Sequence, residues 1–293
     1  MHRILFEIAG YEIRAYPVAM AAAFIINIWL VVRRAPKEGV DPAKVLNACM
    51  LAFVGTLVGG RLLFVITQWS EEFADKPWTE ILRFDRGGLV FYGGFLGALF
   101  LVFGYTTLFR VGFLRVLDLL SPYTGLGLAI HRTFGCFLNG CCYGRPTSMP
   151  WGVIYPPQHP ASRLYGVSTP VHPTQIYESI NGLIIFFALL YFRKRKIKDG
   201  QAGGLLLMIY SINRFIIEFF RGDSVRGNVG ILSTSQFIGI FVFATGIAVW
   251  FIAKKWGSVP YYLDKQNSSI DTTQRPNDVS QSDAIDNAEV SKN

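Results

Sequence analysis

Charged side chains within an apolar segment are the first candidates for chemistry in this sequence. Residues 204–220 are rich in Leu, Ile and Phe, yet they contain Arg214 and Glu218, and Arg221 follows directly. The i, i+4, i+7 spacing predicts that all three charges share one helix face, where Glu218 can pair with either arginine. This pattern fits a structural ion pair, or an anion site in which a guanidinium binds phosphate through two hydrogen bonds.

The segment 131–146 brings a histidine and an arginine close to three cysteines. Arg132 is followed by Cys136, Cys141 and Cys142, with Asn139 between the cysteines. The C-x4-C-C spacing differs from the usual zinc pairs, and adjacent cysteines rarely ligate one ion, so the spacing predicts no metal. Packed thiols or one disulfide are favoured on an outside face. A cysteine nucleophile stays open, although nothing nearby in the sequence identifies its base.

Three further polar residues lie at the edges of apolar segments. His172 begins the run that ends at Glu178, and it is either a helix-start residue or a proton carrier. Tyr92 stands among paired glycines, which suit either close helix packing or the lining of a cavity, and it could also be a belt aromatic. Tyr16 begins the first apolar segment, two residues after Arg14.

The elements that must position these residues follow from composition. Of the 293 residues, 51% are hydrophobic and 16% charged, and the net charge is +8. Soluble domains carry about a quarter charged residues, so the composition excludes a cytosolic enzyme and predicts an all-α polytopic membrane protein. Seven apolar segments are long enough to cross about 30 Å of hydrocarbon. They are 16–32, 46–67, 89–109, 116–134, 176–192, 204–220 and 235–253.

Basic residues predict the orientation of these segments. They follow the first, third, fifth and seventh segments, and such loops belong on the cytoplasmic side. The N-terminus is therefore expected outside (periplasmic), the C-terminus inside, and a structured outside loop between spans four and five. Residues 1–260 form one integral membrane domain, and the polar stretch 261–293 is predicted to be a disordered cytoplasmic tail. The basic excess is assigned to loops facing anionic membrane lipids, with no nucleic-acid partner.

Six short motifs, taken in chain order, resemble the prolipoprotein diacylglyceryl transferase family. They are Arg14-Ala15-Tyr16, Gly59-Gly60-Arg61, Gly88 to Gly97, Asn139-Gly140 with Gly144, His172 to Glu178, and Arg214 with Glu218 to Arg221. Tyr92 stands where the family has a histidine, and a phenol with a pKa of about 10 is a poor base.

The position of the family's signature arginine can be counted in two ways. Counting back from Asn139 places Thr133 there. Counting forward from Asp118 and Pro122 places Arg132 there, with one extra residue before Gly135. The second count is favoured, because of the two residues only Arg132 supplies a guanidinium.

The resemblance implies an activity and a set of site residues. The family moves the diacylglyceryl group of phosphatidylglycerol to the lipobox cysteine of prolipoprotein signal peptides in the bacterial inner membrane, forming a thioether and releasing glycerol phosphate. The active site is expected toward the outer leaflet, without a cofactor or metal. The expected catalytic residues are Arg132, Arg214, Glu218 and, as an alternate base, His172. Phosphatidylglycerol is expected to contact Arg132, Arg214, Tyr16, Tyr92, Asn139 and Arg221.

Two other classes of function fit parts of the same sequence. A noncatalytic lipid-binding or transport protein on this scaffold would bind lipid without making a thioether. A membrane thiol–disulfide or quinone-linked redox protein would instead use Cys136, Cys141 and Cys142.

Overall fold

The computed structural model describes residues 4–8, 10–74, 77–83, 88–222, 228–261 and 263. Within them, a long helix coincides with each of the seven predicted apolar segments. These helices are α1 (Ala15–Arg34), α2 (Pro42–Thr67), α3 (Phe91–Leu108), α4 (Phe113–Ile130), α6 (Thr174–Arg193), α7 (Gln201–Glu218) and α8 (Thr234–Trp256). The predicted tail from residue 264 onward lies outside the described residues.

Five helical stretches in the described part of the chain are long and apolar enough to cross a membrane. They are Ala15–Glu38, Pro42–Thr67, Phe113–Phe137, Thr174–Arg193 and Thr234–Trp256, and Tyr92–Leu108 is a shorter apolar helix. Asn213, Arg214 and Glu218 make α7 more polar than these five. The protein is thus a helical membrane protein, and the count of seven crossing helices stays a prediction.

Short elements connect the helices. Two antiparallel hairpins occur in the described residues, β1 (Ile4–Ile8) with β2 (Tyr11–Arg14) and β3 (Asn228–Val229) with β4 (Leu232–Ser233). They are the departure from the all-α prediction. The remaining short elements are α5 (Pro160–Tyr165), η1 (Ala35–Glu38), η2 (Trp69–Phe73), η3 (Trp78–Leu82) and the π-helical η4 (His131–Phe137).

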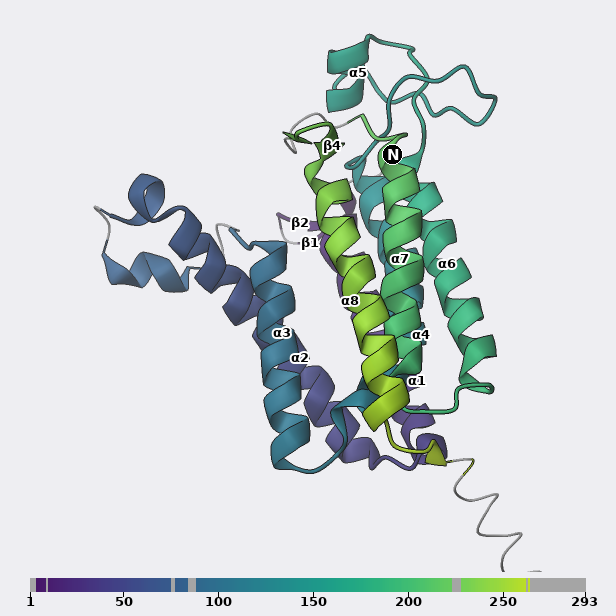
Figure 1. The fold of residues 1–293 in the computed structure, drawn as a ribbon. Coiled ribbons are helices and arrows are strands. Elements are labelled where there is room, and N and C mark those ends of the chain that lie inside the picture. The colour runs from purple at the N-terminus through teal and green to yellow at the C-terminus, as the bar shows by residue number, and fades with distance from the viewer. Residues whose placement is uncertain are drawn as a thin grey trace, which may run out of the picture.

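Glycines set how closely the helices pack. A Cβ atom on Gly97 of α3 would overlap the carbonyl oxygen of Gly55 on α2, so these two backbones are in direct contact. Gly125 and Gly182 bring α4 against α6 in the same way. Figure 1 shows the result: α2 and α3 form a pair at one side of the bundle that contains α4, α6, α7 and α8.

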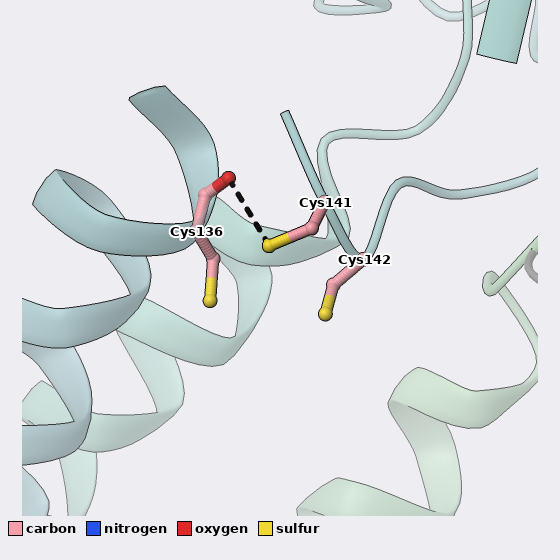
Figure 2. Close-up of side chains that lie close together, drawn as sticks. All are labelled: Cys136, Cys141 and Cys142. Carbon is pink, nitrogen blue, oxygen red and sulfur yellow. Dashed lines mark hydrogen bonds between the residues drawn. The ribbon is translucent and has the colours of Figure 1, made fainter. Parts of the chain in front are cut away.

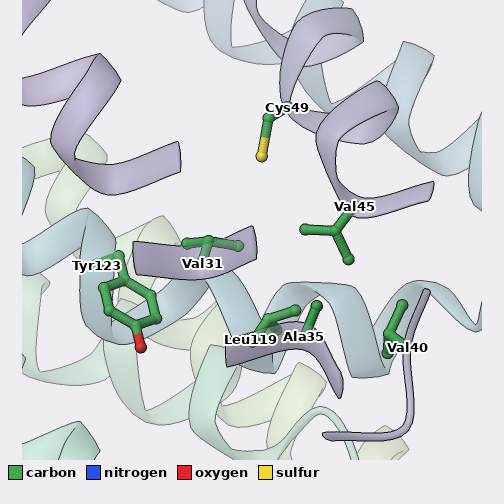
Figure 3. Packing of buried hydrophobic residues seen from close by; sticks show 7 residues of the cluster. All are labelled: Val31, Ala35, Val40, Val45, Cys49, Leu119 and Tyr123. Carbon is green, nitrogen blue, oxygen red and sulfur yellow. The ribbon is translucent and has the colours of Figure 1, made fainter. Parts of the chain in front are cut away.

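A buried apolar cluster joins α1, η1, α2 and α4. It consists of Val31, Ala35, Val40, Val45, Cys49, Leu119 and Tyr123, shown in Figure 3. The outer helix faces are also apolar, since Phe100 and Leu108 expose three quarters of their surface. Large exposed hydrophobic side chains on every side of a bundle suit a lipid environment.

The charge within the fourth predicted segment belongs to a buried ion-pair network. Asp118 of α4 accepts from the Lys196 ammonium at 3.0 Å and from the Gly203 amide at 2.9 Å. Lys196 also contacts Asp199 at 3.0 Å, and Arg115 contacts Asp199 at 2.8 Å. These pairs tie the start of α4 to the loop between α6 and α7. Asp118 therefore has a structural partner at the end of α4 opposite to Arg132.

Candidate active site

Glu178 lies at the centre of a buried cluster of guanidinium groups. It is in the second turn of α6 and only 2% of its surface is exposed. Its carboxylate contacts Arg132 Nε at 2.5 Å, Arg221 Nη1 at 2.9 Å and Arg214 Nε at 3.9 Å. Three segments far apart in the sequence, η4, α6 and the end of α7, thus meet at one carboxylate.

The predicted helical pair on α7 is present. Arg214 Nη1 contacts Glu218 at 2.5 Å, one helical turn along, and Arg214 Nη2 donates to Ser235 Oγ at 3.2 Å. The prediction that Arg221 continues this helix face is wrong, because α7 ends at Glu218. A turn follows, and it directs the Arg221 guanidinium to Glu178 on α6.

The π-helix η4 determines which side chain of this segment reaches the cluster. A π-turn accommodates one more residue per turn than an α-helix, which is how a one-residue insertion is absorbed without breaking a helix. Arg132 contacts Glu178, whereas the Thr133 hydroxyl lies 2.7 Å from Ser179 Oγ on α6. The π-helical turn thus places Arg132 in the cluster, while Thr133 contacts the residue that follows Glu178 on α6.

A loop segment at Gly144 fixes the end of α7 next to the start of α6. The Gly144 amide donates to the His172 carbonyl at 2.9 Å, and the Arg145 amide donates to the Phe220 carbonyl at 3.0 Å. A Cβ at Gly144 would lie 2.5 Å from the His172 Cβ and 2.6 Å from the Phe220 carbonyl oxygen. Only glycine fits here, and the contact fixes the backbone that carries Arg221.

His172 lies two residues before α6 and contacts Tyr177 and Phe220, which directly precede Glu178 and Arg221 in the chain. Its Nδ1 is 3.0 Å from the Tyr177 hydroxyl, and its ring packs edge-on against Phe220. Burial, together with the charge of Arg145, lowers the pKa of His172 below its usual value. The imidazole is therefore neutral near pH 7 and able to accept a proton.

The other predicted lipid contacts are more dispersed. Tyr16 is in the first turn of α1 and packs edge-on against His131, next to Arg132. Asn139 follows η4, near the Cys141 thiol. Tyr92 is on α3, which packs mainly against α2, and its side chain is 45% exposed. Tyr16 and Asn139 thus accompany the cluster, while Tyr92 belongs to the neighbouring helix pair.

Two arginines from the six family-like motifs, Arg61 and Arg14, make contacts outside the Glu178 cluster. Arg61 donates to the carbonyls of Ile81 and Glu80, both at 2.8 Å, and so holds the segment that precedes α3. Arg14 pairs with Glu12 at 3.0 Å on the surface. Neither contact involves Glu178.

Sequence reasoning missed the central role of Glu178 and the supporting role of its neighbours. The Thr174 hydroxyl donates to the Cys142 carbonyl at 2.5 Å, and the Gln175 amide donates to the Cys141 carbonyl at 2.6 Å. Gln175 also donates to the Tyr155 hydroxyl at 3.0 Å, and burial raises the pKa of Tyr155 to about 12. The sequence did contain a signal for this role, because Glu178 follows the polar pair Thr174-Gln175 by one helical turn at the start of an apolar helix.

The three cysteines that follow Arg132 lie together. Their sulfur atoms are all within 4.8 Å of one another. Figure 2 shows Cys136 at the end of one helical turn, with Cys141 and Cys142 on the chain that returns over it. Arg132 Nη1 donates to the Cys142 sulfur at 3.5 Å and to the Cys136 sulfur at 3.7 Å. Arg132 therefore connects the thiols to the Glu178 cluster.

The sequence profile described as prolipoprotein diacylglyceryl transferase matches residues 3–252. The chain belongs to this family. The match includes every helix that contributes to the Glu178 cluster, and it confirms the resemblance seen in the six motifs.

Curated bacterial relatives of this family cover nearly the same region. A phosphatidylglycerol–prolipoprotein diacylglyceryl transferase of Clostridium tetani is 37% identical over 250 residues, 85% of this chain and 97% of the relative. The transferase 2 of Clostridium perfringens is 34% identical, covering 88% of this chain and 97% of its own length. The transferase of Vibrio parahaemolyticus is 32% identical, covering 89% and 93%.

Proposed function

We propose that this chain transfers the diacylglyceryl group of phosphatidylglycerol to a cysteine thiol of a prolipoprotein. The observation that carries the proposal is the charge of the buried cluster. The guanidiniums of Arg132, Arg214 and Arg221 converge on the single buried carboxylate of Glu178. Several guanidiniums brought together at one buried place suit a phosphate-bearing ligand, and the names of the relatives specify phosphatidylglycerol.

The proposed reaction uses this charge in the transition state. The sulfur of the acceptor cysteine bonds to the glyceryl carbon while the bond from that carbon to the phosphate oxygen breaks. The phosphodiester carries one negative charge, and the departing glycerol phosphate gains a second. Guanidiniums already in place stabilise charge that develops during the reaction more than charge that is present before it. Arg132 and Arg214 are assigned this role, with Glu178 and Glu218 holding them in place.

The acceptor thiol must lose its proton, because the thiolate is the nucleophile. We assign the proton to His172, whose neutral imidazole lies between Tyr177 and Phe220. Tyr16, Asn139 and Arg221 are assigned to holding the head group, and Tyr92 to lipid contact on the neighbouring helix pair. In this proposal the arginines supply the positive charge that the phosphate requires.

We further propose seven crossing helices with the cluster toward the outer leaflet. Basic residues gather at the end of the bundle that carries Arg34, Arg115 and Lys196, and the Glu178 cluster lies at the opposite ends of the same helices. Reporter fusions test this topology. A cytoplasmic reporter is expected to be active after Trp256 and inactive at Ser148, and the reverse pattern contradicts the proposal.

The activity is tested with purified protein, phosphatidylglycerol and a lipobox peptide. We expect a peptide mass increase equal to one diacylglyceryl group, abolished in Arg132→Ala and Arg214→Ala. Arg14→Ala is the matched control, because that arginine is exposed and pairs on the surface. Lipid binding without a thioether product would favour the noncatalytic carrier. Full activity of both cluster variants would contradict the proposed mechanism.

A further inference from the structure

The thiol cluster beside Arg132 has a geometry that its sequence spacing did not predict. Gly140 has φ 75° and Cys142 has φ 60°, both in the left-handed region, and the chain folds back over the last turn of η4. The amides of Gly140 and Cys141 both donate to the Cys136 carbonyl, at 2.9 and 3.2 Å. The C-x4-C-C spacing therefore ends with three sulfurs close together, the Cys141 thiol pointing to the Cys136 carbonyl oxygen (Figure 2).

The backbone of this turn is held from several sides. Thr174 and Gln175 bind the carbonyls of Cys142 and Cys141, and the His159 ring contacts the Gly140 carbonyl at 2.5 Å. A left-handed conformation is unfavourable for a non-glycine residue, so surrounding contacts must maintain it at Cys142. The sulfur positions are thus a property of a fixed turn.

The sulfur separations fit one metal ion. A tetrahedral zinc ion with bonds of about 2.3 Å holds its sulfur ligands about 3.8 Å apart. The three sulfurs all lie within 4.8 Å of one another, which is close to that spacing. Three cysteine ligands are also enough for a zinc site that keeps its fourth position for an exogenous ligand.

The surrounding charges favour a divalent ion. Three thiolates and one divalent cation carry a charge of −1, and the guanidinium of Arg132 is the positive group that lies against them. Arg132 Nη1 already donates toward the Cys136 and Cys142 sulfurs. A charged donor in this position is the kind of outer contact that orients metal ligands.

We propose that Cys136, Cys141 and Cys142 form a binding site for a thiophilic divalent cation such as zinc, with three thiolate ligands and a fourth position open to an exogenous ligand. The site goes beyond the proposed transferase function and is tested without reference to it.

The test measures zinc in the full-length protein, purified with a phosphine reductant and equilibrated with zinc. We expect about one zinc per chain. Mutation of a group that only hydrogen-bonds a metal ligand weakens metal affinity roughly 10–100-fold. Removal of a ligand itself should weaken zinc affinity by at least as much, and this is expected for each of Cys136→Ser, Cys141→Ser and Cys142→Ser. Cys49→Ser is the matched control, because Cys49 lies in the core cluster of α1, η1, α2 and α4. It should retain full zinc binding.

Cobalt substitution supplies a readout that needs no variant to fold. Wild-type protein titrated with Co²⁺ should develop sulfur-to-cobalt charge-transfer absorption that added zinc removes. Fully reduced protein that binds no zinc and shows no such absorption would overturn the proposal. A disulfide within the cysteine cluster that persists when zinc and reductant are supplied would overturn it too. Either result leaves the transferase assay unaffected, so the two proposals fail separately.

Discussion

The substitution Glu178→Gln tests whether one carboxylate organises the arginine cluster. The change keeps the shape of the side chain but removes the negative charge that faces Arg132 at 2.5 Å, Arg221 at 2.9 Å and Arg214 at 3.9 Å. The three guanidiniums would lose the carboxylate on which they converge, so the cluster would become more positive by one charge. We expect a large loss of both stability and activity.

The magnitude follows from burial and distance. Two unit charges 2.9 Å apart interact by about 6 kcal/mol at an effective dielectric constant of about 20. Desolvation offsets much of this energy, and removing one partner of a buried pair costs about 3–5 kcal/mol. Glu218→Gln is the matched control, because Glu218 contacts Arg214 one turn away on the same helix. Its cost should be about half as large or less, since fewer guanidiniums lose a partner.

Thermal unfolding of the purified variants in one detergent measures the difference. A loss of 1 kcal/mol lowers Tm by about 2–4 °C in chains of roughly this size, so Glu178→Gln should unfold on the order of 10 °C lower. Transferase turnover should fall about 100-fold, because displacing a catalytic group by 1 Å costs that much. Equal Tm values for Glu178→Gln and Glu218→Gln, or an unchanged Tm for Glu178→Gln, would refute the central role of Glu178.

Three further predictions concern the scaffold and its pH dependence. Gly97→Val should lower the free energy of unfolding by about 1–3 kcal/mol or more, because the new valine side chain would overlap the α2 backbone. Gly104→Ala should leave stability unchanged, because the space around Gly104 is open. Thermal unfolding of the two variants measures the difference. Lys196→Met should cost about 3–5 kcal/mol, since it leaves Asp118 without its ammonium partner; Tm measures this. The lowered pKa of His172 means that the folded protein binds a proton at this histidine less readily than the unfolded chain does. Neutral His172 therefore contributes to stability above about pH 6.5, and this contribution is lost as the pH falls through the pKa of His172 in the folded state. His172→Gln should flatten the pH dependence of Tm in that window, and an unchanged slope would contradict the assignment.

Local features of the fold were predictable from the sequence. Apolar runs of about 17 to 22 residues identified the seven long helices, because a bilayer-length helix needs an unbroken apolar surface. The i, i+4 spacing of Arg214 and Glu218 predicted their contact, because residues one turn apart on a helix are neighbours. Both inferences use distances along a single element.

Contacts between elements were not predictable in the same way. Glu178 pairs with arginines 46 and 43 residues away, a partnership that depends on how η4, α6 and α7 pack. Arg221 left the predicted helix face because α7 ends three residues before it. The cysteines converge because Gly140 and Cys142 adopt left-handed conformations, which their spacing in the sequence does not reveal.

The two counts for the signature arginine show how local and tertiary information combine. Spacing from Asn139 alone favours Thr133, and it assumes a regular helix. The π-turn of η4 removes that assumption, because it holds one extra residue while the flanking turns keep their direction. Arg132 then faces Glu178 on one side and the cysteine sulfurs on the other. The Arg132 guanidinium is thus shared by a carboxylate and a group of thiols that compete for its positive charge. A ligand that adds negative charge at either group therefore alters the field at the other.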